Sequence, residues 1–173
     1  MKSTPRSAEL VRLDYAPYES PIGTLHLFAT PTELVRIDFR APPKSVTALA
    51  PKAPKNPVLR RTISQLKEYF AGRRTKFELP LAMIGTPFQM RVWKELSRIP
   101  FGETISYGEQ AKRVGAGKAY RAVGTANGRN PIPIVVPCHR VIASGGGLGG
   151  YGGGLGMKSK LLKLEASIMD SAT

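Results

Sequence analysis

The chain has 173 residues and a mass of 18.8 kDa, which suits one ordinary domain or two small ones and excludes a large multidomain assembly. Its residues are 42% hydrophobic and 22% charged, and no apolar run reaches the roughly 20 residues that a membrane-spanning helix needs. Residues 1–12 mix charged residues with Ser and Pro and lack the apolar stretch of a secretory signal. We therefore expect a cytoplasmic protein without membrane association.

Basic residues are in excess throughout the chain. Residues 1–86 hold 14 basic and 7 acidic residues, and residues 87–173 hold 12 and 5, so a basic tail on a neutral domain does not explain the net charge of +14. A basic surface is compatible with solubility alone, but it also indicates a polyanionic partner. Nucleic acid is favoured over an anionic membrane because no basic amphipathic helix is evident.

Cys138 is the only cysteine, so the chain has no internal disulfide, and two histidines are too few to complete a four-ligand Cys/His zinc site. A lone cysteine is most often a small buried hydrophobic residue. His139 follows it directly, however, and a nearby histidine promotes the thiolate form that makes a cysteine nucleophilic. The pair is a candidate nucleophile and base, and we expect no zinc site.

Residues 1–84 predict a small α/β domain that begins with an antiparallel sheet. Short apolar stretches alternate with turn residues, which is typical of a meander of strands. The predicted strands are Leu10 to Tyr15, Thr24 to Ala29 and Leu34 to Phe39. Residues 41–57 are rich in Pro, Ala and Lys and lack periodicity, so we expect them to form a surface connection.

One helix is predicted to complete this domain. Asn56 is a suitable N-cap, Pro57 fits the first helical position, and an apolar stripe continues until Gly72 ends the helix. Residues 73–81 return to an extended pattern.

A change to short helices and tight turns predicts a mostly helical C-terminal domain of residues 85–173. A capping-box pattern at residues 86–89 begins a helix that stops before Pro100. A second capping pattern at residues 106–109 begins a helix that ends at Gly115.

A further helix is predicted from about Lys118 to Ala126, and it forms a pair with the preceding helix around a Gly-containing turn. Such a pair is either a helix-turn-helix or an ordinary corner between helices, and the pattern leaves both open. Small side chains let the second helix approach another helix or a DNA groove closely. Its small residues are Ala119, Ala122, Gly124 and Ala126, and its charged residues are Arg121 and Arg129.

Cys138 lies in residues 130–140, where three prolines argue against a helix and the apolar residues predict a buried extended path. Residues 145–156 then hold nine of the 18 glycines. A flexible linker is one explanation, but only one predicted helix, Met157 to Met169, follows, so we expect a loop whose backbone lies against a ligand. The GxGxxG match at residues 147–152 does not indicate a dinucleotide site, because no further βαβ strand follows.

Three polar residues could complete a site around the Cys-His pair. Glu165 could orient His139, Tyr107 could donate a proton, and Asn130 could fix the backbone or the imidazole. Each also has an ordinary structural explanation, as a solvated carboxylate, a packed aromatic residue and a turn residue. The residues alone leave these alternatives open.

Several segments taken together resemble the signature blocks of the O6-alkylguanine-DNA alkyltransferases. They are residues 99–108 (IPFGETISYG), 121–128 (RAVGTANG), 130–141 (NPIPIVVPCHRV) and the final LLKLE. The PCHRV run is the most specific of them. The similarity is strong over residues 86–165, whereas residues 1–80 match only in the layout of strands and helix.

The resemblance implies a ribonuclease-H-like α/β N-terminal domain, with an antiparallel sheet plus a helix. It also implies a mostly helical C-terminal domain whose helix-turn-helix enters the minor groove. The implied partner is double-stranded DNA that contains O6-alkylguanine, bound by a monomer with no obligate protein partner. The implied activity is DNA repair by direct damage reversal, in which Cys138 takes the alkyl group, a methyl group above all, from a flipped guanine irreversibly and in a single turnover.

The resemblance also implies roles for individual residues. His139 would act as a base through a water molecule, Glu165 would polarise His139, and Tyr107 would protonate the departing guanine at N3. Arg121 would fill the space that the flipped base leaves, and Asn130 would brace the turn at the active site. The implied pocket walls are Val141, Tyr151 and Gly152, and the implied DNA-contacting residues beside Arg121 are Ala119, Ala122, Ala126 and Arg129.

Two other functions compete with this interpretation. A non-catalytic, alkyltransferase-like protein that binds lesions lacks the nucleophile, whereas this chain retains Cys138. A Cys-His hydrolase accounts neither for the helix pair nor for the basic charge. The chain departs from some members of the family at Gly152, where they have Ser, and we expect a looser pocket wall there.

Overall fold

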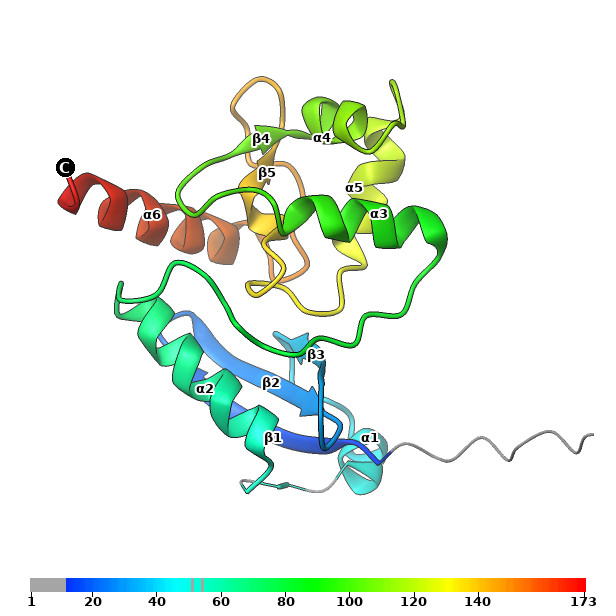
Figure 1. Ribbon diagram of the computed structural model, residues 1–173, viewed down its shortest axis with the longest axis vertical. Helices are drawn as coiled ribbons and strands as arrows, with labels where there is room; N and C mark the ends of the chain where they lie inside the picture. Colours follow the sequence, from blue (N-terminus) through cyan, green and yellow to red (C-terminus); the bar gives the residue numbers. More distant parts are fainter. Residues whose placement is uncertain (1–11, 51, 54) are drawn as a thin grey trace, which may run out of the picture.

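The computed structural model of the chain describes residues 12–50, 52–53 and 55–173. It contains a small α/β unit, seen at the bottom of Figure 1, and a helical unit stacked on it. One hydrophobic core continues through both units. No helix in the described part of the chain is both long and apolar enough to span a membrane.

The N-terminal unit is built on an antiparallel sheet in which β1 (Asp14–Ser20), β2 (Gly23–Ala29) and β3 (Leu34–Asp38) are neighbours in that order. The predicted meander is therefore confirmed. The prediction for the first strand was wrong in position: the strand continues to Ser20, and the predicted residues Leu10 and Val11 lie outside the described part. Pro17 is the reason, because proline has no N–H for strand pairing and therefore indicates the end of a strand. Here it is tolerated within the strand, since β1 is an edge strand and Pro17 is exposed.

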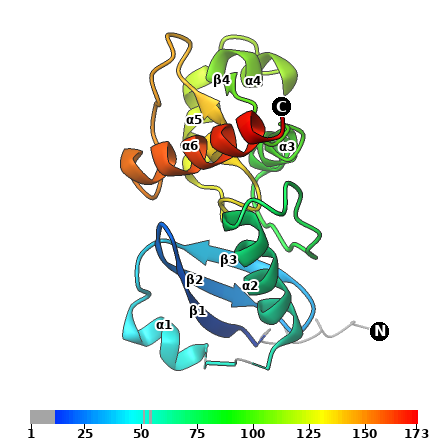
Figure 2. The same ribbon diagram turned by 90° about the vertical axis from the view of Figure 1, so that its left-hand side faces the viewer.

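Helix α2 (Pro57–Phe70) lies against this sheet, as Figures 1 and 2 show. Asn56 caps it, as predicted: its side chain accepts hydrogen bonds from the amides of Val58 and Leu59. The same side chain donates to Asp14 Oδ2 at 2.9 Å and to the carbonyl of Thr30 at 3.0 Å. The buried cap thus ties the start of α2 to two parts of the sheet.

The connection between sheet and helix differs from the prediction because it contains helix α1 (Lys44–Leu49). None of the residues of α1 is buried, so its sequence carries no apolar stripe that could have indicated a helix. After α2 the chain runs extended along the free edge of β3. There the amide of Leu34 donates to the carbonyl of Pro80, and the amide of Ala82 donates to the carbonyl of Leu34.

The C-terminal unit holds the remaining helices, which are α3 (Pro87–Leu96), α4 (Tyr107–Arg113), α5 (Tyr120–Gly128) and α6 (Leu155–Ser171). The capping box of Thr86 and Gln89 is present at the start of α3. Helices α4 and α5 pack together as the helix-turn-helix. A short parallel pair of strands, β4 (Ile105–Ser106) and β5 (Val141–Ile142), was not predicted, since two residues are too few to show a period.

Several contacts hold the units together, and two of them involve α6 and β3. Helix α6 lies on the N-terminal unit in both views (Figures 1 and 2), and Ile168 meets the turn at Gly72 after α2. The amide of Ile37, in β3, donates to the carbonyl of Pro131 at 2.9 Å. The sheet therefore supports the segment that leads to Cys138.

We predict that Asn56→Ala lowers the free energy of unfolding by about 2 to 3 kcal/mol, since it removes a helix cap and leaves buried polar groups without partners. Thr86→Ala, which removes the exposed cap of α3, is the matched control and should lower it by about 1 kcal/mol. Urea unfolding followed by circular dichroism measures both values. Equal losses in the two variants would show that the buried contacts of Asn56 add nothing.

Candidate active site

Cys138 begins a short 3₁₀ turn, η1 (Cys138–Arg140), at the end of a buried segment. Asn130 braces this segment: its Nδ2 donates to the carbonyl of Val136 at 2.7 Å, and its Oδ1 accepts from the amide of Ile132 at 3.0 Å. Ile134 has a φ of 74°, which a β-branched residue rarely adopts. The packed and hydrogen-bonded surroundings thus hold a strained turn that fixes the position of the thiol.

The thiol of Cys138 is protonated at rest. Burial raises its pKa to about 11, and the nearby Asn130 amide and Lys158 ammonium lower it only in part. A thiol in this state needs a base to become a nucleophile.

His139 is completely buried, and its Nε2 lies 2.7 Å from Glu165 Oε1. Burial lowers the pKa of His139, while the hydrogen bond to Glu165 opposes the change. The geometry assigns the proton to Nε2, because a carboxylate oxygen can only accept. Nδ1 is buried and has no hydrogen-bond partner among the described residues. The imidazole therefore offers a free lone pair on Nδ1.

Arg140 holds the same carboxylate with two nitrogens: Nε donates to Oε2 of Glu165 at 2.9 Å, and Nη2 donates to Oε1 at 3.0 Å. The amide of Gly102 also donates to Oε2, at 3.1 Å. Burial raises the pKa of Glu165, but the hydrogen bonds from His139 and Arg140 outweigh it and bring the pKa down to about 2. Glu165 is thus a carboxylate at any physiological pH.

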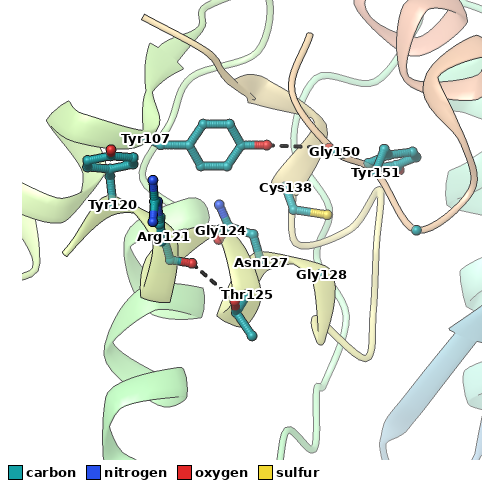
Figure 3. A pocket seen from close by; sticks show the side chains of 11 residues that line it. Tyr107, Tyr120, Arg121, Gly124, Thr125, Asn127, Gly128, Cys138, Gly150 and Tyr151 are labelled. Atoms are coloured by element: carbon teal, nitrogen blue, oxygen red, sulfur yellow. Dashed lines mark hydrogen bonds between the residues drawn. The ribbon is translucent and has the colours of Figure 1, made fainter.

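A cavity of about 570 Å³ opens above Cys138, between α5 and the glycine-rich loop of residues 145–154 (Figure 3). The Cys138 sulfur points toward Tyr151, and the hydroxyl of Tyr107 donates to the carbonyl of Gly150 at 3.3 Å. The residues that line the cavity are Tyr107, Tyr120, Arg121, Gly124, Thr125, Asn127, Gly128, Cys138, Gly150, Tyr151 and Gly152. The structure therefore brings the predicted Tyr107, Arg121, Cys138, Tyr151 and Gly152 to one cavity.

The glycine-rich loop lies against this cavity. Gly149 has a φ of 69°, and a Cβ there would lie 2.6 Å from the ring of Tyr107, so only glycine fits. A Cβ at Gly152 would meet nothing within 4 Å, so the pocket wall is open at this residue.

Lys158 anchors this loop from α6 and was not among the predicted site residues. The side chain is fully buried, and its ammonium donates to the carbonyls of Val141, Leu148 and Gly150 and lies 3.4 Å from the Tyr107 hydroxyl. Burial lowers the pKa of Lys158 to about 8, and the neighbouring Cys138 opposes this change. A sequence signal did exist, because the buried face of α6 carries two charged residues at helical spacing, Lys158 and Glu165.

Two predicted contacts need correction. Val141 does not line the cavity: its side chain is fully buried where β5 pairs with β4. Ala126 is only 3% exposed, and its carbonyl accepts a hydrogen bond from Trp93 Nε1, so this face of α5 packs on the core and does not face a groove. The other predicted residues of this segment are exposed: Arg121 and Ala122 lie in α5, and Ala119 and Arg129 flank it.

The fold and this site define the class of protein to which the chain belongs. It is a DNA-binding protein in which a helix-turn-helix lies beside a buried cysteine, and the histidine that follows this cysteine contacts a carboxylate.

Comparisons with known proteins identify the family. Residues 87–167 match the family model described as "6-O-methylguanine DNA methyltransferase, DNA binding domain". Residues 13–83 match the model described as "6-O-methylguanine DNA methyltransferase, ribonuclease-like domain". The chain therefore belongs to the 6-O-methylguanine DNA methyltransferase family.

Relatives and solved structures agree with this family. The methylated-DNA–protein-cysteine methyltransferase of Mycobacterium leprae is 51% identical over 85% of this chain and 88% of its own length. That of Methanosarcina acetivorans is 47% identical over 88% of this chain and 98% of its own length. The crystal structure of Mycobacterium tuberculosis OGT in complex with DNA has a TM-score of 0.81 and 46% identity, and the match covers 90% of this chain and 94% of that one.

We predict that Lys158→Met loosens the glycine-rich loop, because it removes the ammonium that three loop and strand carbonyls share. The amides of residues 145–153 should exchange with solvent faster by about tenfold or more. Lys160→Met, an exposed lysine on the same helix, is the matched control and should leave these rates unchanged. Hydrogen exchange followed by mass spectrometry measures both, and unchanged rates in Lys158→Met would contradict the anchoring role.

Proposed function

We propose that this protein repairs DNA by direct reversal of alkylation. It transfers an alkyl group, a methyl group above all, from O6 of guanine in duplex DNA to Sγ of Cys138, once per chain and without a cofactor. The observation that carries the proposal is the buried Cys138, which opens on a cavity beside the helix-turn-helix and is backed by His139 and Glu165. Family membership and a similar structure that was solved with DNA support it.

The proposed reaction begins at the thiol. The proton of Cys138 passes, through a water molecule, to the free Nδ1 of His139, and Glu165 stabilises the imidazolium that forms. Sγ then attacks the alkyl carbon, and the bond between that carbon and O6 breaks. The product is a thioether, which has no hydrolytic exit, so each chain reacts once.

The departing guanine needs a proton. We assign this role to Tyr107, whose hydroxyl lies at the cavity and would protonate N3. The ammonium of Lys158 lies 3.4 Å from the same hydroxyl and would stabilise the phenolate that remains. Asn130 would serve by bracing the turn that carries Cys138.

Base flipping would bring the guanine to the buried thiol, because an O6 atom inside a duplex cannot reach it. Arg121 is an exposed cation on α5 at the rim of the cavity, and its neighbours Ala119 and Ala122 are small and exposed. We propose that this face enters the minor groove and that Arg121 fills the vacated stack. Arg129 would contact phosphate.

We further propose that the protein acts as a monomer in the cytoplasm, with domains of residues 1–84 and 85–173. The non-catalytic lesion-binding alternative remains the main competitor, and the chemistry of Cys138 separates the two.

The direct test is methyl transfer followed by intact-mass spectrometry. Wild-type protein mixed with excess methylated duplex should gain one methyl group per chain and then stop, and Cys138→Ser should gain none while it still binds the duplex, because a hydroxyl ionises far less readily than a thiol. Transfer in the Ser variant would overturn the assignment of the nucleophile. Several turnovers per chain would indicate a hydrolase, and binding without transfer by the wild type would indicate a lesion-binding protein.

Arg121→Ala tests base flipping. We predict that it slows transfer from a methylated duplex by roughly 10- to 100-fold, which corresponds to about 1.4 to 2.8 kcal/mol, while transfer from free O6-alkylguanine changes little. Arg129→Ala is the matched control: loss of a phosphate contact should weaken binding to all DNA alike and reduce the salt slope by about one. Single-turnover rates at two salt concentrations measure the effect. An equal loss on both substrates for Arg121→Ala would show that this residue supports the pocket or the fold instead.

A further inference from the structure

Tyr69, in the last turn of α2, connects the N-terminal unit to the candidate catalytic centre. Its hydroxyl donates a hydrogen bond of 2.7 Å to Glu165 Oε1. Among the side-chain hydrogen bonds of the described residues, this is the one that crosses from residues 12–84 to residues 85–173. The N-terminal unit therefore reaches a residue that we assign to the reaction.

The hydroxyl of Tyr69 is held in place and stays neutral. The side chain is fully buried, and its ring packs against the rings of Phe70, Phe77 and Phe101, with centroids 5.2, 5.4 and 6.0 Å away. Burial raises the pKa of Tyr69 well above its ordinary value, and Glu165 adds to this effect. A neutral, immobile hydroxyl beside a carboxylate can only donate.

Tyr69 and His139 share one oxygen. The hydroxyl and Nε2 of His139 both lie 2.7 Å from Oε1 of Glu165, so the two donors compete for its charge. Arg140 donates to both oxygens of the same carboxylate, and these two hydrogen bonds do not involve Tyr69.

We infer that Tyr69 is a positioning residue for the alkyl transfer: its hydroxyl shares Oε1 of Glu165 with His139 and so limits the negative charge that the imidazole receives. The inference rests on the proposed function. It gives the N-terminal unit a part in the chemistry besides its part in the fold, since the base would be adjusted by a residue from the other half of the chain.

The sign of the effect follows from the shared oxygen. When the hydroxyl is removed, Oε1 carries more charge for His139, and the imidazolium becomes more stable, so the pKa of His139 rises. The base then takes up a solvent proton at a higher pH and can no longer accept one from Cys138. The other charged groups around His139 are Arg140 in η1 and Lys158 in α6, both of which lower its pKa, and they are unchanged in a Tyr69 variant.

The experiment measures the reactivity of Cys138 without DNA. Cys138 is the only thiol, so alkylation by iodoacetamide reports on it alone: Sγ displaces iodide, and the thiol proton leaves through the base. We expect Tyr69→Phe to move the acid limb of the pH profile to higher pH, so that the rate constant at a pH on that limb falls by about three- to tenfold. The titration of His139 is measured in parallel by NMR of the histidine side chains, since His26 and His139 are the two histidines of the chain.

Tyr15→Phe is the matched control. Tyr15 is also a buried tyrosine with a 2.7 Å hydrogen bond, but its partner is His26, in the sheet of the N-terminal unit. This variant should leave the titration of His139 and the reactivity of Cys138 as they are. Tyr69→Phe should change both.

A second substitution keeps the test decisive if Tyr69→Phe fails to fold. 3-Fluorotyrosine at position 69 makes the hydroxyl a stronger donor, and the titration midpoint of His139 should then move to lower pH. A rate that falls equally at every pH, or a midpoint that stays in place in both variants, would overturn the inference and leave Tyr69 a purely structural residue. Failure of the wild type to accept a methyl group from DNA would instead overturn the proposed function, while the His139 titration would still decide the role of Tyr69.

Discussion

The buried carboxylate of Glu165 is the group on which the rest of the site depends. Five donors from four residues, Tyr69, Gly102, His139 and Arg140, reach it within 3.1 Å. A charge taken out of water this completely is tolerated only when it is paired and fully hydrogen-bonded. The need to satisfy one carboxylate therefore joins α2, the turn before β4, η1 and α6 into a single arrangement.

Local patterns predicted much of this molecule, because they belong to short stretches of chain. The cap at Asn56, the capping box at Thr86 and the proline-rich path to Cys138 are each determined by a few neighbouring residues. The errors also have local causes. The first strand was predicted to end too early because it contains Pro17, and α1 was not predicted because it has no buried apolar stripe. The pairing of strands and the layout of the two units followed from the same patterns.

The site was predictable only where adjacency or a family motif carried it. Cys138 and His139 are neighbours in sequence, and the motif supplied Glu165 as a partner. Tyr69 and Lys158 were missed because their roles depend on packing between distant segments: Tyr69 lies 96 residues from the carboxylate it contacts. The motif also suggested Val141 as a pocket wall, but its side chain is fully buried in the core.

The raised pKa of Cys138 has a consequence for the durability of the protein. Oxidants such as peroxide attack thiolates, and a thiol with a pKa of about 11 is almost wholly protonated in a neutral solution. The chain has no second cysteine that could rescue an oxidised sulfur as an internal disulfide. Burial thus acts as redox protection: it keeps the thiol that we propose as the alkyl acceptor in its reduced form.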